Sequence, residues 1–203
     1  MKSTILPRSF FERDPVTCAR ELIGCELTWN ECAGLIVETE AYAAVNDEAC
    51  HTFFRPSARE FIASREPGSA YVYLNYGMYW LLNVLVKGGA EDGFVLFRAL
   101  EPTRGIALMS QRRHGTASER PATSLCSGPG KLTIALGIDG REHGRDLCAG
   151  AEIGFRAPPQ RLAVEADARI GISRAAHLPW RFLAKGNDFV SAGPAAAKRA
   201  AGK

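Results

Sequence analysis

The stretch "LIVETEAYAAVNDEACH", Leu35 to His51, begins like a buried β-strand and then places two carboxylates within it. β-Branched and aromatic residues are frequent in its first half, so residues 35–42 are predicted to be extended. Side chains alternate between the two faces of a strand. One face then carries both acids and a tyrosine, namely Ile36, Glu38, Glu40 and Tyr42. The other face carries Leu35, Val37, Thr39 and Ala41.

A second predicted strand, "GFVLFRAL" at Gly93–Leu100, places a cation on an apolar face. Arg98 there shares a face with Phe94, Leu96 and Leu100. A charge in such surroundings requires an anionic partner. Glu40 and Arg98 are therefore candidates for each other, either as a buried ion pair or as a general base and a cation that together hold a water.

The remaining patterns alternate between helix and strand. "DPVTCARELIG" predicts a helix with Asp14 as N-cap and Pro15 at its first position, and "SARE" at Ser57–Glu60 predicts a capping box that opens a short helix through Arg65. Two strands around "NYG" form a predicted hairpin, in which Tyr71 and Tyr79 are expected in the core. Helices are expected near Ile106 and Met109 and over Pro129–Leu136, and one or two strands near the end.

These elements predict an α+β fold, with a curved, mainly antiparallel β-sheet and flanking helices. Residues 1–192 are expected to form a single domain and residues 193–203 a disordered tail. The uncharged run Pro67–Val86 holds tyrosines, asparagines and glycines, which favour a folded hairpin over a membrane span.

Charge and cysteine content restrict the class of protein. The chain has 203 residues and a net charge of +3, but residues 1–50 hold 4 basic and 9 acidic side chains, so the remainder is basic. An arginine-rich region at 98–131 indicates a polyanionic partner or, alternatively, an ordinary mixed-charge surface. The six cysteines lack paired metal spacing, and no secretory signal is apparent. A cytoplasmic protein with free thiols is expected.

Six motifs occur in a fixed order along the chain: "VETEAY", "DEACH", "AYVYLNYGMYWLLNV", "RALEP", "LCSGPGKL" and "PWRF". Together they resemble the alkyladenine (3-methyladenine) DNA glycosylase family. The resemblance runs from Val37 to Phe182 and therefore covers most of the chain.

The resemblance implies a role for each matching residue. Glu40 would be the general base that activates a water, and Arg98 would help to position that water. Tyr76 would intercalate into the gap left by a flipped nucleotide. The extruded base would be held by Tyr42, His51, Tyr73 and Asn83. Independently of the resemblance, Ser127, Gly128 and Lys131 lie where a helix N-terminus follows glycines, which indicates a contact with the DNA backbone or, alternatively, merely a tight loop.

Physical chemistry fits this assignment. Enzymes that act on a base extrude it from the stack, which costs least for damaged bases. An N-alkylated purine is cationic, so aromatic faces attract it and it leaves readily. Neither Lys87 nor Lys131 matches a catalytic position, so a monofunctional glycosylase without a cofactor is expected. It would act as a monomer on damaged double-stranded DNA, in the nucleoid if the cell is prokaryotic, and without a membrane.

Two other classes of function fit parts of the pattern. A non-catalytic module could recognise distorted nucleic acid with Tyr76 and the basic region. A metal-dependent hydrolase could use Asp47, Glu48 and His51, although no second histidine is near and no metal site is expected. The stretch "TFFRPSAREFIASREP" also departs from the "TPRN" and "MF" that many relatives carry. Substrate range is therefore the least determined property.

Overall fold

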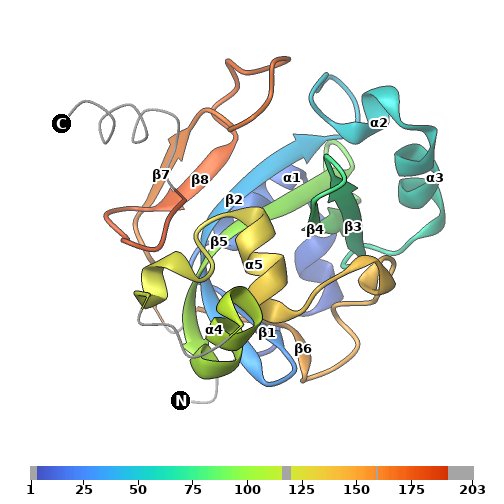
Figure 1. Ribbon diagram of the computed structural model, residues 1–203. Coiled ribbons are helices and arrows are strands. Elements are labelled where there is room, and N and C mark those ends of the chain that lie inside the picture. Colours follow the sequence, from blue (N-terminus) through green and yellow to red (C-terminus); the bar gives the residue numbers. More distant parts are fainter. Residues whose placement is uncertain (1–3, 116–119, 159, 192–203) are drawn as a thin grey trace.

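The computed structural model describes residues 4–115, 120–158 and 160–191. Its strands form one curled sheet in which every pairing is antiparallel (Figure 1). The order is β3-β4-β5-β2-β1-β6, and β8 pairs with β2 and with β7. The strands are β1 (Glu26–Trp29), β2 (Cys32–Ala43), β3 (Ala70–Asn75), β4 (Tyr79–Val86), β5 (Gly93–Arg104), β6 (Ile153–Arg156), β7 (Val164–Asp167) and β8 (Arg181–Ala184).

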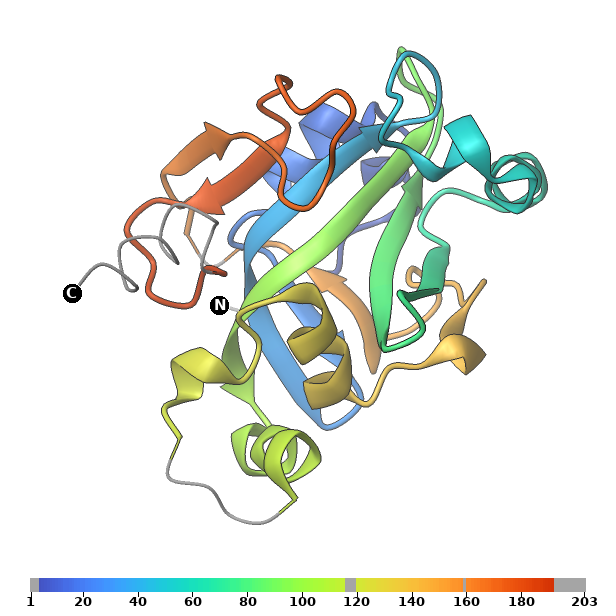
Figure 2. The same cartoon turned by 45° about the horizontal axis from the view of Figure 1, so that its top comes forward.

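Helices cover both faces of this sheet, as Figures 1 and 2 show. α1 packs on β2 and β5 from one side, and α5 packs on β4 and β5 from the other. The helices are α1 (Pro15–Glu21), α2 (His51–Phe54), α3 (Pro56–Ser64), α4 (Ile106–His114) and α5 (Pro129–Leu136), with 3-10 turns at Arg8–Phe11, Ala122–Ser124 and Gly140–Glu142. The predicted α+β class with a curved antiparallel sheet is confirmed.

Local sequence signals explain several boundaries. Asp14 caps α1, since its carboxylate accepts from the backbone N–H of Thr17 at 2.8 Å, a contact typically worth about 1 kcal/mol. The β3–β4 hairpin turns at Tyr76 and Gly77, both with positive φ. α5 spans Pro129–Leu136 as predicted and ends at Gly137, which adopts the left-handed conformation.

Three register shifts interrupt the pairing of β2 with β5, and two of them lie beside the charged residues. Ile36 pairs with Leu100 and Glu38 with Ala99, so Val37 is an extra residue on β2. Thr39 then pairs with Phe97, which leaves Arg98 as the compensating extra residue on β5. The strict alternation predicted over Ile36–Tyr42 and over Phe94–Leu100 is therefore interrupted at Val37 and at Arg98.

Three other predictions need correction. The capping box at Ser57–Glu60 is absent: α3 begins at Pro56, whose ring presets the helical φ, and no side chain caps it. The strand predicted to end at Leu100 continues to Arg104 as β5, and the helix expected near Ile106 and Met109 follows as α4. Tyr79 is 47% exposed and lies across Gly130, whereas Tyr71 is buried as expected. The expected tail, residues 193–203, lies outside the described residues.

Two apolar clusters hold the sheet and helices together. The main core contains Phe11, Trp29, Phe97 and Phe155 among many aliphatic side chains. The smaller cluster joins Phe61 and Ile62 of α3 to Tyr71, Leu85 and Phe94 of the sheet. All six cysteines are free thiols. No helix in the described part of the chain combines the length and apolar character needed to cross a bilayer.

Candidate active site

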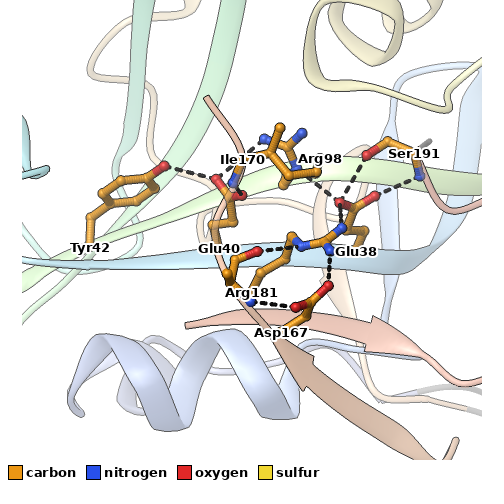
Figure 3. Close-up of polar contacts among 9 residues, drawn as sticks. Glu38, Glu40, Tyr42, Arg98, Asp167, Ile170, Arg181 and Ser191 are labelled. Atoms are coloured by element: carbon orange, nitrogen blue, oxygen red, sulfur yellow. Dashed lines mark hydrogen bonds and ion pairs between the residues drawn. The ribbon is translucent and has the colours of Figure 1, made fainter. Parts of the chain in front are cut away.

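Glu40 lies on β2 at the centre of the sheet and is fully buried. Its partner across the sheet, Leu96 of β5, lies two residues from Arg98, so both charged side chains lie on the same side (Figure 3). The Oε2 atom of Glu40 accepts from the Tyr42 hydroxyl at 2.8 Å and from Nη1 of Arg98 at 3.3 Å. The Oε1 atom accepts from the backbone N–H of Ile170 at 2.7 Å.

A second buried carboxylate, Glu38, has a fuller set of donors (Figure 3). Nε of Arg98 donates to it at 2.9 Å and Nη1 of Arg181 at 3.2 Å. Ser191 adds its backbone N–H and its hydroxyl. Three of these bonds end on Oε1 and one on Oε2, so Glu38 accepts four bonds, of the roughly four that a carboxylate can accept, against three for Glu40. Glu40 accepts three bonds in the described structure, which leaves one site open on Oε1.

The positive charge of Arg98 lies between the negative charges of Glu38 and Glu40. Burial alone would lower the pKa of its guanidinium, but the charges of Glu40 and Glu38 outweigh burial and raise that pKa. Burial, together with the neighbouring Glu40 carboxylate, raises the pKa of Tyr42 well above its usual range. Tyr42 therefore stays protonated and donates to Glu40. Arg181 extends the cluster to Asp167 of β7.

A cavity of about 550 Å³ opens beside this cluster, within the range of small-ligand sites. Six of the residues predicted from the sequence line it: Tyr42, His51, Tyr73, Tyr76, Asn83 and Arg98. Glu40 does not line the cavity. It lies directly behind the wall, in contact with Tyr42, Arg98 and Ile170, which all do.

The aromatic wall of the cavity includes a neutral histidine. Burial, and secondarily the charge of Arg55, lowers the pKa of His51 to about 4. Its Nδ1 and the Tyr71 hydroxyl form a hydrogen bond of 3.0 Å, and its ring lies 4.3 Å from that of Tyr73, centroid to centroid. These two rings are in contact, so they form one continuous wall.

The remaining predicted residues lie at the edges of the cavity. Tyr76, at the hairpin tip, is 83% exposed and stands at the mouth. Asn83 is buried, and its amide donates to the backbone carbonyl of Tyr71 at 3.1 Å. Ser127, Gly128 and Lys131 line a separate, more open cavity of about 460 Å³, and Arg98 reaches both.

Asp47, Glu48 and His51, the candidate metal ligands of the alternative function, do not form a metal site in the described structure. Both carboxylate oxygens of Asp47 accept from Arg169, at 2.6 and 2.8 Å, and from backbone N–H groups. Glu48 is exposed, whereas His51 bonds to Tyr71. Among the described residues, no group of three or more histidine, cysteine, aspartate or glutamate side chains is placed to hold a metal ion.

Several site residues were not identified from the sequence. Ile170, Arg181 and Ser191 reach the carboxylates from the last third of the chain. Arg169 pairs with Asp47 and lies 4.6 Å from the Tyr42 ring centroid. Glu38 had a local signal, because it is two residues from Glu40 on the same strand face, and Arg181 lies within the "PWRF" motif.

Known proteins are similar to this chain over most of its length. The sequence model of the family described as "Methylpurine-DNA glycosylase (MPG)" matches residues 9–188. A protein of Rhizobium etli named "Putative 3-methyladenine DNA glycosylase" is 47% identical over 186 residues, which cover 91% of this chain and 87% of the relative. Proteins with the same name from Rhodopseudomonas palustris BisB18 (45% identical; 92% and 90% covered) and Rubrobacter xylanophilus (43%; 82% and 86%) are also similar. The chain therefore belongs to the methylpurine-DNA glycosylase family.

Proposed function

We propose that the protein is a monofunctional DNA glycosylase that releases 3-methyladenine and related alkylated purines from double-stranded DNA and so starts base excision repair. The observation that carries this proposal is the open lone-pair site on the buried Glu40, next to Arg98 and directly behind an aromatic cavity. It acts as a monomer on DNA in the cytoplasm.

Recognition begins with extrusion of the damaged nucleotide. Tyr76, exposed at a tight hairpin tip, enters the gap in the base stack, where its ring replaces the lost stacking. The flipped base enters the cavity against Tyr42, His51 and Tyr73. A cationic purine is attracted by these electron-rich faces, and Asn83 borders the base at the cavity edge.

Hydrolysis then requires one water molecule and one side chain that acts as a general base. The water, held by Glu40 and Arg98, attacks C1′ of the sugar as the bond from C1′ to the purine nitrogen breaks. The bonding electrons leave with the base and neutralise its positive charge. Glu40 accepts the water proton at Oε1, and the buried carboxylates stabilise the oxocarbenium-like charge on the sugar.

The second cavity is suited to the phosphate backbone. Ser127, Gly128 and Lys131 lie at the first turn of α5, where free backbone N–H groups and the helix dipole favour an anion. Since Arg98 also reaches this cavity, a phosphate there would tie the DNA backbone to the catalytic cluster.

The direct test uses duplex DNA treated with a methylating agent. Wild-type protein should release methylated purines and leave abasic sites that alkali converts to breaks. Glu40→Gln should reduce release by a thousandfold or more, on the order of the loss of a catalytic base together with its electrostatic stabilisation. Glu165→Gln, which removes an exposed strand carboxylate, is the matched control and should retain full activity.

The same assay distinguishes the other classes. A non-catalytic recognition module would bind the damaged duplex tightly and release no base, with or without Glu40. A metal-dependent hydrolase would lose activity in EDTA, whereas the proposed mechanism retains it. A Schiff-base enzyme would be trapped on DNA by borohydride. No adduct is expected here, because no lysine of the described residues lines the cavity in which the base is proposed to lie.

A further inference from the structure

Arg55 occupies a distinctive position at the cavity. It is the single residue between α2 and α3, in the stretch that departs from the family pattern. It lines the cavity, and its guanidinium carbon lies 5.6 Å from the ring centroid of Tyr73 and 5.8 Å from that of Phe54. A cation therefore already faces the aromatic wall on which the base is proposed to rest.

Other arginines near the cavity have carboxylate partners. Arg98 is paired with Glu38 and Glu40, and Arg169 is paired with Asp47. No carboxylate of the described residues lies within salt-bridge distance of Arg55. Arg55 and Arg98 are the charged residues that line the cavity, so the uncompensated charge there is that of Arg55.

The field of this charge reaches the other wall residues. It adds to burial in keeping His51 neutral, and it opposes the effect of burial on the pKa of Tyr73. A purine in the cavity would lie among the same rings. Arg55 lies 5.6 Å from the Tyr73 ring centroid, so a charge on a purine that rests against this ring would be close to the guanidinium. At such a separation, partly screened by solvent, the interaction of the two charges changes an equilibrium or a rate by roughly three- to tenfold.

We propose that Arg55 is a specificity-determining residue whose unpaired charge favours neutral purine lesions, such as hypoxanthine, over cationic N-alkylated purines. This inference rests on the proposed glycosylase function. A cationic base is repelled by the guanidinium, which offsets part of its attraction to the rings. A neutral base is not repelled, and its departure gains from the nearby cation.

The gain follows from the electron balance of the reaction. When a neutral base leaves, the electron pair of the bond to C1′ passes to the base, which becomes negatively charged. The water oxygen forms the new bond to C1′, and Glu40 takes one water proton. That proton is finally returned to the departed base. Arg55 stabilises the negative charge until then, without giving up its own proton.

The test compares two duplexes of the same sequence, one with a single hypoxanthine and one with a single 7-methylguanine, which is cationic. Single-turnover efficiencies are measured for full-length wild type, Arg55→Gln and Arg55→Lys. We expect the ratio of hypoxanthine to 7-methylguanine release to fall about three- to tenfold in Arg55→Gln and to be retained in Arg55→Lys. Arg65→Gln, which removes an exposed charge just after α3, should leave the ratio unchanged.

Other outcomes overturn the inference. Equal losses on both duplexes in Arg55→Gln would make Arg55 a backbone contact, and a Lys variant that behaves like Gln would make it a stacking group. Wild type that releases 7-methylguanine but no hypoxanthine also contradicts it. Release of neither base by a protein that frees 3-methyladenine from methylated duplex DNA contradicts it as well, whereas failure on all three substrates would instead reject the proposed function. Thermal melting of each variant checks that the protein remains folded.

Discussion

Ser191 donates both its backbone N–H and its hydroxyl to the carboxylate of Glu38, at 2.6 and 2.9 Å, although 153 residues separate them in the sequence. The same carboxylate accepts from Arg98, which in turn contacts Glu40. The end of the described chain therefore helps to set the orientation of the buried cluster of Glu38, Arg98 and Glu40.

Glu38→Gln should affect both stability and base release. Removing one partner of a buried ion pair costs about 3 to 5 kcal/mol of unfolding free energy. Because Arg98 loses its shorter contact, we also expect base release to slow by about ten- to hundredfold. Chemical denaturation and single-turnover kinetics measure the two effects. Ser191→Ala removes only the hydroxyl bond and should cost about 1 kcal/mol. A destabilised Glu38→Gln protein with an unchanged rate would show that Glu38 is purely structural.

Asp47→Asn should destabilise the protein strongly, since Asp47 and Arg169 are both fully buried side chains. The substitution leaves the guanidinium charge without its partner, at a cost of about 3 to 5 kcal/mol. Glu21→Gln removes the half-exposed partner of Arg13 and should cost less than about 1 kcal/mol. Denaturant unfolding of both variants measures the contrast, and similar losses would contradict the assigned difference in burial.

The lowered pKa of His51 predicts that the folded protein loses stability in mild acid. The pKa of His51 is about 4 in the folded protein, below the usual value of 6.5 for a histidine side chain. The unfolded chain therefore binds more protons between these values, so stability is complete above pH 6.5 and falls as the pH approaches 4. The melting temperature of wild type should drop more steeply over this window than that of His51→Gln. His177→Gln, at an exposed position, should follow wild type.

Tyr76→Ala should slow base release without unfolding the protein. The side chain is 83% exposed, so its loss should change the melting temperature little. Loss of one base–aromatic stacking contact, worth about 1 to 3 kcal/mol, corresponds to roughly ten- to hundredfold in release. Tyr76→Phe retains the ring and should stay within about threefold of wild type. Equal activity of Tyr76→Ala and wild type on duplex DNA would argue against intercalation.

Part of this fold could be predicted from short stretches of sequence. The Asp14 cap, the β3–β4 hairpin and the bounds of α5 follow from turn formers, capping residues and periodicity within about ten neighbours. The shared face of Glu40, Tyr42 and Arg98 also followed from strand alternation, because the extra residues Val37 on β2 and Arg98 on β5 compensate each other before Glu40 is reached.

The three-dimensional environment of the carboxylates could not be predicted in this way. The extra residues Val37 and Arg98 result from the pairing of two strands far apart in sequence, and no local propensity encodes them. β8 adds to β2 beside Glu38 and Glu40, and the segments around it bring in Ile170 and Ser191. Strand composition alone thus determined which acids face inward. Only the closed tertiary structure decided that Arg98, Arg181 and Ser191 converge on Glu38 while Glu40 accepts one bond fewer, because a hydrogen-bond count depends on every segment that reaches the buried carboxylate.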